Sequence, residues 1–147
     1  MQNSLVSVHT FDIKSKVTRT MDLQLDKEDY IPRIRFTSDP EKLAIMVLNR
    51  HQNRFDLYFA NPRSTLCKVA IRDEAPQYIK EQAYANIEFF DKNIVMMSER
   101  DGYNHLYLYT IGGNLVKQIT KGDFEVKDFL GWDQNANVFY YTSNEES

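Results

Sequence analysis

The sequence predicts an all-β protein built from repeated four-stranded antiparallel units. Two hairpin signals follow one another in residues 98–120, where Asp101-Gly102 and Gly112-Gly113-Asn114 each precede a strand-like apolar run. The same order of strand end, polar turn and strand with Leu-Tyr at its centre occurs in residues 48–59. Aromatic residues make up 13% of the chain, which favours sheet surfaces. A repeated hairpin unit therefore determines the fold class.

Each expected strand is an alternating or short continuous apolar run bounded by turn residues. In chain order the expected strands span residues 4–12, 17–25, 30–36, 43–48, 55–60, 65–71, 87–90, 94–98, 105–111, 115–119, 126–132 and 137–142. Pro32 lies near the start of its strand, where a missing N–H donor is tolerated. A looser stretch, residues 72–86, separates the two complete units.

The units repeat at a spacing of about 40 to 50 residues, which is typical of β-propeller blades. Residues 30–71 and 87–120 are each expected to form a full blade, residues 1–25 the end of a blade, and residues 124–147 the start of one. The whole chain, residues 1–147, is then part of one β-propeller domain that begins and ends inside a repeat. Uncovered sheet faces and strand edges favour association with a second copy, so we expect a homodimer.

Composition and charge exclude several classes of function. The net charge of −3 gives no electrostatic basis for binding nucleic acid or anionic lipid. No apolar run approaches the roughly 20 residues needed to span a bilayer. The single cysteine, Cys67, excludes an internal disulfide and is expected to be a small core residue. No cofactor and no metal site are expected, because no cysteine or histidine has metal-ligand spacing.

Residues that could carry chemistry are few, and none is assigned a catalytic role. The Gly-x-Ser-x-Gly motif of serine hydrolases does not occur in the sequence. His9, His51 and His105 fall one per unit at loosely equivalent positions, which indicates a structural cause. Glu145 and Glu146 are adjacent, so their side chains point to opposite sides and we expect a solvated turn.

Four blocks of the sequence carry a resemblance to a known family: residues 48–53, 98–105, 118–126 and 138–145. The strongest is the Ser-x-x-x-Gly-Tyr-x-His turn, followed by Thr-Lys-Gly. Together these blocks resemble the N-terminal propeller domain of the dipeptidyl peptidase IV family, and its bacterial-type members fit best. The resemblance implies a parent serine peptidase of the prolyl oligopeptidase group. Such enzymes pair an eight-bladed propeller with an α/β-hydrolase domain, and remove N-terminal X-Pro or X-Ala dipeptides.

The resemblance also implies a role for this segment. Family catalytic and amino-group-binding residues lie outside it, so the segment forms a non-catalytic cavity wall that restricts substrate access. By position, Tyr78 or Tyr84 would contact an extended peptide substrate. The implied partners are peptide substrate, the hydrolase domain and the remaining blades, and the implied location is periplasmic or extracellular. The alternatives are a non-enzymatic propeller that acts as an interaction scaffold, and the propeller of an acylaminoacyl peptidase.

Overall fold

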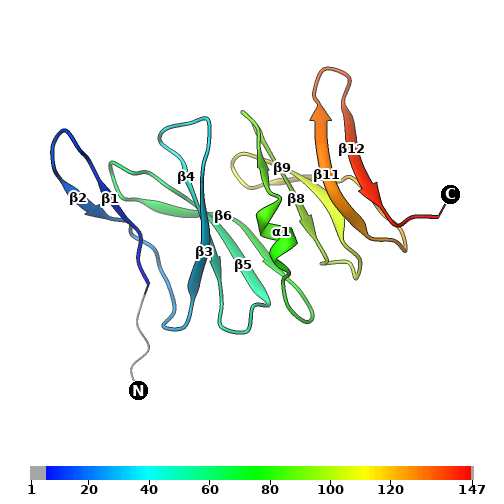
Figure 1. Cartoon of the computed structure of the whole chain (residues 1–147), viewed down its shortest axis with the longest axis horizontal. Helices are drawn as coiled ribbons and strands as arrows, with labels where there is room; N and C mark the ends of the chain where they lie inside the picture. The colour runs from blue at the N-terminus through cyan, green and yellow to red at the C-terminus, as the bar shows by residue number, and fades with distance from the viewer. Residues whose placement is uncertain (1–5, 147) are drawn as a thin grey trace. The chain divides into compact units, whose positions relative to one another are not determined.

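A computed structural model describes residues 6–146 of the chain (Figure 1). Within them the chain forms strands and one short helix, which lie in order as β1 His9–Phe11, β2 Thr18–Thr20, β3 Tyr30–Phe36, β4 Leu43–Leu48, β5 Arg54–Ala60, β6 Cys67–Glu74, α1 Glu81–Ala85, β7 Glu88–Phe89, β8 Asn93–Ser98, β9 His105–Thr110, β10 Leu115–Gln118, β11 Val126–Asp133 and β12 Val138–Ser143. The all-β prediction is confirmed.

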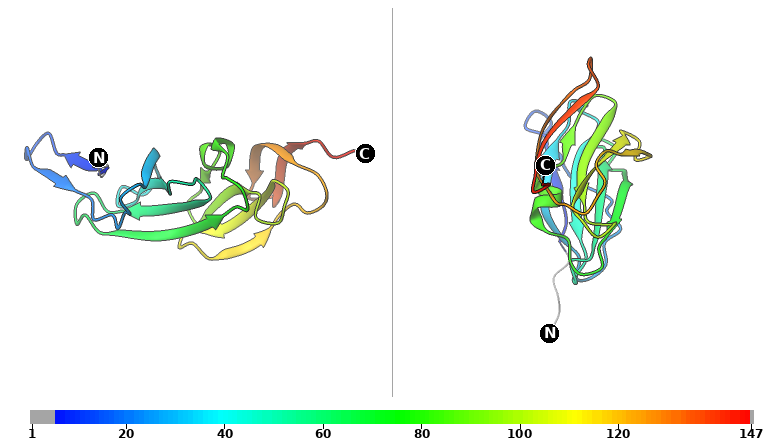
Figure 2. Two further views of the ribbon diagram at one scale, coloured as in Figure 1. Left: turned by 90° about the horizontal axis from the view of Figure 1, so that it is seen from below. Right: turned by 90° about the vertical axis from the view of Figure 1, so that its right-hand side faces the viewer.

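Every sheet pairs strands that follow one another in the sequence. Two sheets have four antiparallel strands, in the orders β3-β4-β5-β6 and β10-β9-β8-β7. Two more have two antiparallel strands each, β1-β2 and β11-β12. The described residues therefore form two complete blades flanked by two half-blades, as the sequence predicts. The strands of each blade show the usual sheet twist (Figure 2).

The chain divides into two compact units, Met1–Tyr78 and Ile79–Ser147. The core of the first unit joins the half-blade β1-β2 to the complete blade β3–β6. Its buried residues are Met21, Leu43, Ile45, Val47, Tyr58 and Ala60. Leu23 and Leu25, which follow β2, pack against this cluster. Alternate residues of the central strand β4 thus bury one apolar face against the preceding half-blade.

The second unit repeats this arrangement between the blade β7–β10 and the half-blade β11-β12. Its core cluster consists of Val95, Met97, Leu106, Leu108, Phe124 and Val126. Trp132 packs at the edge of the cluster, stacked on Phe139 with ring centroids 5.0 Å apart and edge-on to Phe90 at 5.2 Å. These aromatic contacts add to the apolar area that the unit buries.

Three hairpin turns share one local structure. Each begins with an Asp or Asn whose side chain accepts hydrogen bonds from the backbone N–H groups two and three residues later; these residues are Asp12, Asn61 and Asp133. The fifth residue of each turn, Lys16, Thr65 or Asn137, has a positive φ between 55° and 68°. The two backbone N–H groups hold the pKa of the Asp12 carboxyl below its usual value.

These turns move two strand boundaries away from the predicted positions. The strand expected at residues 65–71 is Cys67–Glu74, because Thr65 still belongs to the turn with φ of 68°. The strand expected at 137–142 is Val138–Ser143, because Asn137 likewise has φ of 55°. A β-branched residue such as Thr65 rarely adopts this conformation, and the strand was therefore predicted to begin at Thr65.

Other differences are shortened strands and one unexpected helix. The strand expected at 17–25 forms only at Thr18–Thr20, because the residues after it leave the sheet to pack into the core. The strand expected at 4–12 is observed at His9–Phe11, and its first two positions lie outside the described residues. Within the stretch 72–86, the good helix formers of Glu81–Ala85 make a single helical segment, which contacts β8.

Candidate functional site

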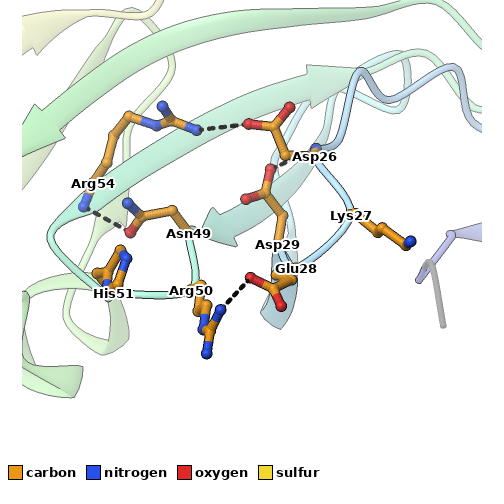
Figure 3. Close-up of a pocket in the computed structure, with 8 residues that line it drawn as sticks. All are labelled: Asp26, Lys27, Glu28, Asp29, Asn49, Arg50, His51 and Arg54. Carbon is orange, nitrogen blue, oxygen red and sulfur yellow. Dashed lines mark hydrogen bonds and ion pairs between the residues drawn. The ribbon is translucent and has the colours of Figure 1, made fainter. Parts of the chain in front are cut away.

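A pocket in the first unit lies between the turn that leads into β3 and the turn that joins β4 to β5 (Figure 3). Its volume is about 450 Å³. Six of its residues carry a formal charge, three acidic and three basic, and His51 and Asn49 complete the lining: Asp26, Lys27, Glu28, Asp29, Asn49, Arg50, His51 and Arg54. The pocket is therefore a polar site suited to a charged ligand group rather than to an apolar one.

Asn49 gives the β4–β5 turn its shape. Its side-chain oxygen accepts hydrogen bonds from the backbone N–H groups of Asn53 and Arg54, both at 3.0 Å. Its amide nitrogen donates to the side-chain oxygen of Asn53 at 2.7 Å. Gln52 takes a positive φ of 57° to close the turn. This internal bonding fixes the pocket side of the turn without help from a ligand.

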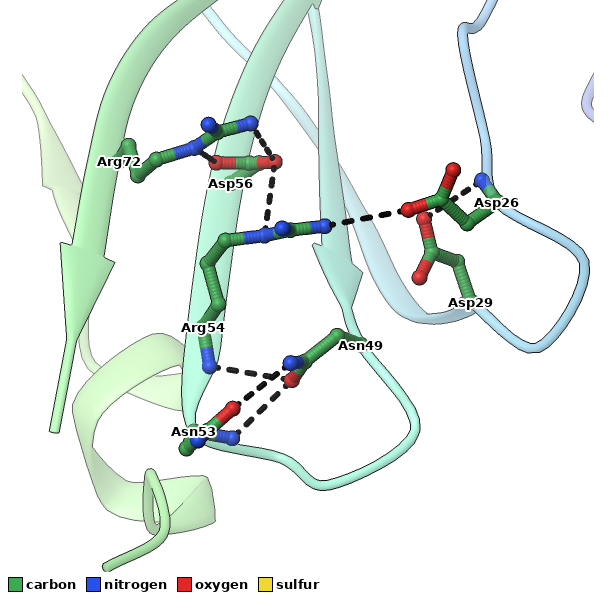
Figure 4. Close-up of polar contacts among 7 residues, drawn as sticks. All are labelled: Asp26, Asp29, Asn49, Asn53, Arg54, Asp56 and Arg72. Carbon is green, nitrogen blue, oxygen red and sulfur yellow. Dashed lines mark hydrogen bonds and ion pairs between the residues drawn. The ribbon is translucent and has the colours of Figure 1, made fainter. Parts of the chain in front are cut away.

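A chain of ion pairs connects the pocket to the interior of the blade (Figure 4). Arg54 lies 3.7 Å from Asp26 and 3.9 Å from the buried carboxylate of Asp56. Arg72 donates two hydrogen bonds to Asp56, at 2.7 and 2.9 Å. These bonds to a carboxylate raise the pKa of Arg72 above its ordinary value. Arg54 thereby ties the entry loop of the blade to β5 and, through Asp56 and Arg72, to β6.

The pocket has a counterpart in the second unit. That pocket, of about 460 Å³, lies between the loop leading into β11 and the residues after β12, and is lined by Lys121, Gly122, Asp123, Phe124, Asn144, Glu145 and Glu146. Both pockets thus occupy the same place in the repeat. Glu145 and Glu146 are exposed there, as the sequence predicts for a solvated turn.

Two of the three histidines are equivalent in the repeat, and the third is not. His9 begins the first strand of the half-blade β1-β2, and His105 begins the third strand of the blade β7–β10. Each has a threonine hydroxyl close to Nδ1, Thr20 at 2.9 Å and Thr120 at 2.8 Å. His51 lies instead in the turn beside the pocket. The expected structural cause therefore applies to two histidines. Their shared contact is a hydrogen bond to a threonine that ends the neighbouring strand, as Thr20 does, or lies just beyond it, as Thr120 does.

A Ser–His contact near the start of the chain lacks the third member of a hydrolase triad. Ser7 Oγ lies 2.8 Å from Nε2 of His9, but the other ring nitrogen faces the Thr20 hydroxyl, where a triad has a carboxylate. Within residues 6–146 no group of three His, Cys, Asp or Glu side chains is placed to hold a metal ion. The same residues include no helix long and apolar enough to cross a bilayer.

The two tyrosines assigned to substrate contact lie on different units. Tyr78 is the last residue of the first unit and is 52% exposed. Tyr84 lies on α1 in the second unit and is half-buried. Their substrate role stays a prediction. Of the residues that line the first pocket, His51 alone was singled out from the sequence, and it was expected to have a structural role. Polar residues in a turn look the same in a sequence whether or not they form a pocket.

Cys67 is half-buried beside the core of the first unit, and burial raises the pKa of its thiol. We therefore expect alkylation by iodoacetamide at pH 8 to be slower in the folded chain than in urea, with its rate rising at a higher pH. The raised pKa means that the folded chain favours the neutral thiol over the thiolate. The contribution of the buried thiol to the free energy of unfolding is therefore fully present at low pH, and it is lost as the pH rises through the folded-state pKa. Equal alkylation rates in both states would contradict this.

Comparisons with known proteins agree with the fold. The family described as the dipeptidyl peptidase IV (DPP IV) N-terminal region matches residues 1–147. The chain is 26% identical to dipeptidyl peptidase 4 of Trichophyton rubrum, over 97% of this chain and 19% of that protein. A crystal structure of Porphyromonas gingivalis dipeptidyl peptidase 4 superimposes with a TM-score of 0.90 at 34% identity, covering 96% of this chain and 20% of that one. The chain spans about a fifth of the length of these relatives.

Proposed function

The chain belongs to the family of dipeptidyl peptidase IV N-terminal regions, and we propose that it is a non-catalytic part of the propeller domain of a serine exopeptidase of this kind. The observation that carries the proposal is the family match over the whole chain, together with the close superposition on a dipeptidyl peptidase 4 structure. In this proposal the complete enzyme removes X-Pro and X-Ala dipeptides from the amino termini of peptides, and its catalytic serine lies outside this chain.

In the same proposal, these blades form one wall of a cavity and limit which polypeptides reach the catalytic centre. The well-packed sheets support this role, because strand β4 is buried along its whole length and offers a rigid scaffold for the loops. The partners are the hydrolase domain, the remaining blades and a second copy in a homodimer. The proposed location is periplasmic or extracellular. No cofactor is part of the proposal.

A first experiment compares this chain with the complete protein that contains it. The complete protein is expected to release p-nitroaniline from Gly-Pro-p-nitroanilide, and the isolated 147-residue chain to release none. Peptides with the same X-Pro start but increasing length, ending in a folded domain, should show a falling kcat/KM. A complete protein without this activity would contradict the enzymatic proposal, and an unchanged kcat/KM would contradict the cavity wall.

The tyrosine prediction is tested in the same enzyme. Tyr78→Ala or Tyr84→Ala is expected to raise KM severalfold for peptides that extend beyond the cleaved dipeptide, and to leave KM for the dipeptide p-nitroanilide unchanged. The physical reason is loss of an aromatic contact made only by the extended part of the substrate. Tyr103→Ala, at a 38% exposed turn residue, serves as the control. Equal effects on both substrates would contradict a role in the extended pocket.

A further inference from the structure

The two equivalent pockets differ in one feature, which points to a ligand in the first. Asp29, in the first pocket, is only 8% exposed, although it is a charged residue. The charged residues of the second pocket, Lys121, Asp123, Glu145 and Glu146, are all exposed. Carboxylates are rarely buried to this degree unless a partner compensates for the lost hydration. The first pocket therefore holds a carboxylate in a setting that the second does not reproduce.

Only one oxygen of the Asp29 carboxylate has a partner among the described residues. Its Oδ2 accepts a hydrogen bond from the backbone N–H of Asp26 at 2.9 Å. The other oxygen points into the space between the two turns (Figure 3). A second backbone bond, from Asp29 N–H to the Asp26 carbonyl at 3.1 Å, fixes the loop in this form. The free oxygen is thus held in place by the protein's own bonds.

The neighbouring charges leave Asp29 without a counterion inside residues 6–146. Arg54 pairs with Asp26 at 3.7 Å, and Arg50 pairs with Glu28 at 2.9 Å. Lys27 lies on the same loop, but its side chain points away from Asp29 (Figure 3). The two arginines are therefore engaged with the other two acidic residues. Asp29 is therefore the acidic residue of the pocket whose negative charge a cationic ligand group would balance.

We propose that this pocket binds a primary ammonium group, as carried by a lysine side chain or the amino terminus of a peptide, with Asp29 as its counterion. An ammonium is a compact charge that can donate to a single oxygen. A guanidinium favours two parallel hydrogen bonds to both oxygens of one carboxylate, and here one of these oxygens is occupied. A metal ion is disfavoured because the described residues provide no three-ligand cluster. This binding is independent of the proposed peptidase activity.

The test is a nuclear magnetic resonance titration of the 15N-labelled 147-residue chain. The probes are acetyl-Gly-Lys-Gly-amide, the same peptide with arginine or norleucine in place of lysine, and Gly-norleucine-Gly-amide with a free amino terminus. We expect saturable shifts at Asp29, Asn49 and His51 with an ammonium-bearing probe. The arginine peptide should bind at least tenfold more weakly, and the acetylated norleucine peptide should cause no shifts. Which ammonium probe binds more tightly tells a lysine side chain from an amino terminus.

Two matched variants locate the binding. Asp29→Asn keeps an oxygen that can accept from Asp26 N–H but removes the charge, and should weaken binding at least tenfold. Asp123→Asn, at an exposed carboxylate of the equivalent pocket, should leave the affinity unchanged.

Two results on the unmodified chain would overturn the proposal. One is that neither ammonium probe causes saturable shifts, and the other is that the arginine peptide binds as tightly as the lysine peptide. Binding that survives in folded Asp29→Asn also overturns it. Because none of these measurements uses catalysis, a failed peptidase assay leaves this proposal unaffected.

Discussion

Replacing His105 with alanine is expected to lower the free energy of unfolding of the second unit by about 3 to 4 kcal/mol. His105 is fully buried. Its Nε2 lies 2.9 Å from the Gly122 carbonyl, which can only accept, so Nε2 carries the hydrogen. In the neutral ring Nδ1 then accepts from the Thr120 hydroxyl, which itself accepts from Leu106 N–H at 3.0 Å. The substitution leaves a cavity and breaks this buried chain of bonds.

The measurement is urea unfolding followed by the fluorescence of Trp132, the single tryptophan of the chain, which lies in the second unit. His9→Ala is the matched control, because His9 has the same threonine contact on an exposed strand and should cost under about 1 kcal/mol. Since His9 lies in the first unit, this variant is followed by the alkylation rate of Cys67, which lies in the same unit. His105→Phe restores most of the volume without the hydrogen bonds and should recover only part of the loss. A His105→Ala midpoint equal to that of the unmodified chain would show that the buried bonds contribute nothing.

Asp56→Ala is expected to destabilise the first unit by about 2 to 3 kcal/mol. The Asp56 side chain is 5% exposed and receives both hydrogen bonds of Arg72, and the substitution leaves that guanidinium and Arg54 without their shared carboxylate. The estimate lies below that for a fully buried pair, because the Arg72 side chain is 51% exposed.

Cys67 provides the probe for this unit, since its alkylation rate reports local opening. The rate in Asp56→Ala should rise roughly in proportion to the population of the open state. Glu28→Gln is the control: the Glu28–Arg50 pair is equally short at 2.9 Å, but its side chains are 37% and 67% exposed, so its loss should cost under about 1 kcal/mol. If both variants accelerate alkylation equally, burial of Asp56 does not matter to its contribution.

The sequence predicts the strands well because the signals for them are local. Alternation and turn residues lie within each hairpin, and every sheet joins neighbours in the chain. The boundaries at Thr65 and Asn137 were wrong because both residues complete a turn that an Asn or Asp begins four positions earlier. The repetition of this turn at Asp12, Asn61 and Asp133 is a signal that the sequence does contain.

The site could not be predicted in the same way, because its character depends on burial. Asp29 is acidic and follows three charged residues, Asp26, Lys27 and Glu28, which by themselves indicate a solvated loop. It becomes buried only when this loop meets the β4–β5 turn, which comes from a different hairpin. Arg54 similarly pairs with Asp26, which lies in the loop before the blade, and with Asp56, which lies on the same strand as Arg54. Pairing of this kind between separate hairpins leaves no periodic pattern in a sequence.

The contacts of Asn104 and His105 have a consequence for synthesis on the ribosome. Both lie where β9 begins, yet their partners come after β10: Gly122 lies in the segment that leads into β11, and Val126 is the first residue of β11. When the last strand of this blade leaves the ribosome, its third strand still lacks partners for two buried polar side chains. We expect the blade to become resistant to proteases only after residues 120–126 have emerged. Vectorial synthesis would then complete this blade with the segment that begins the next.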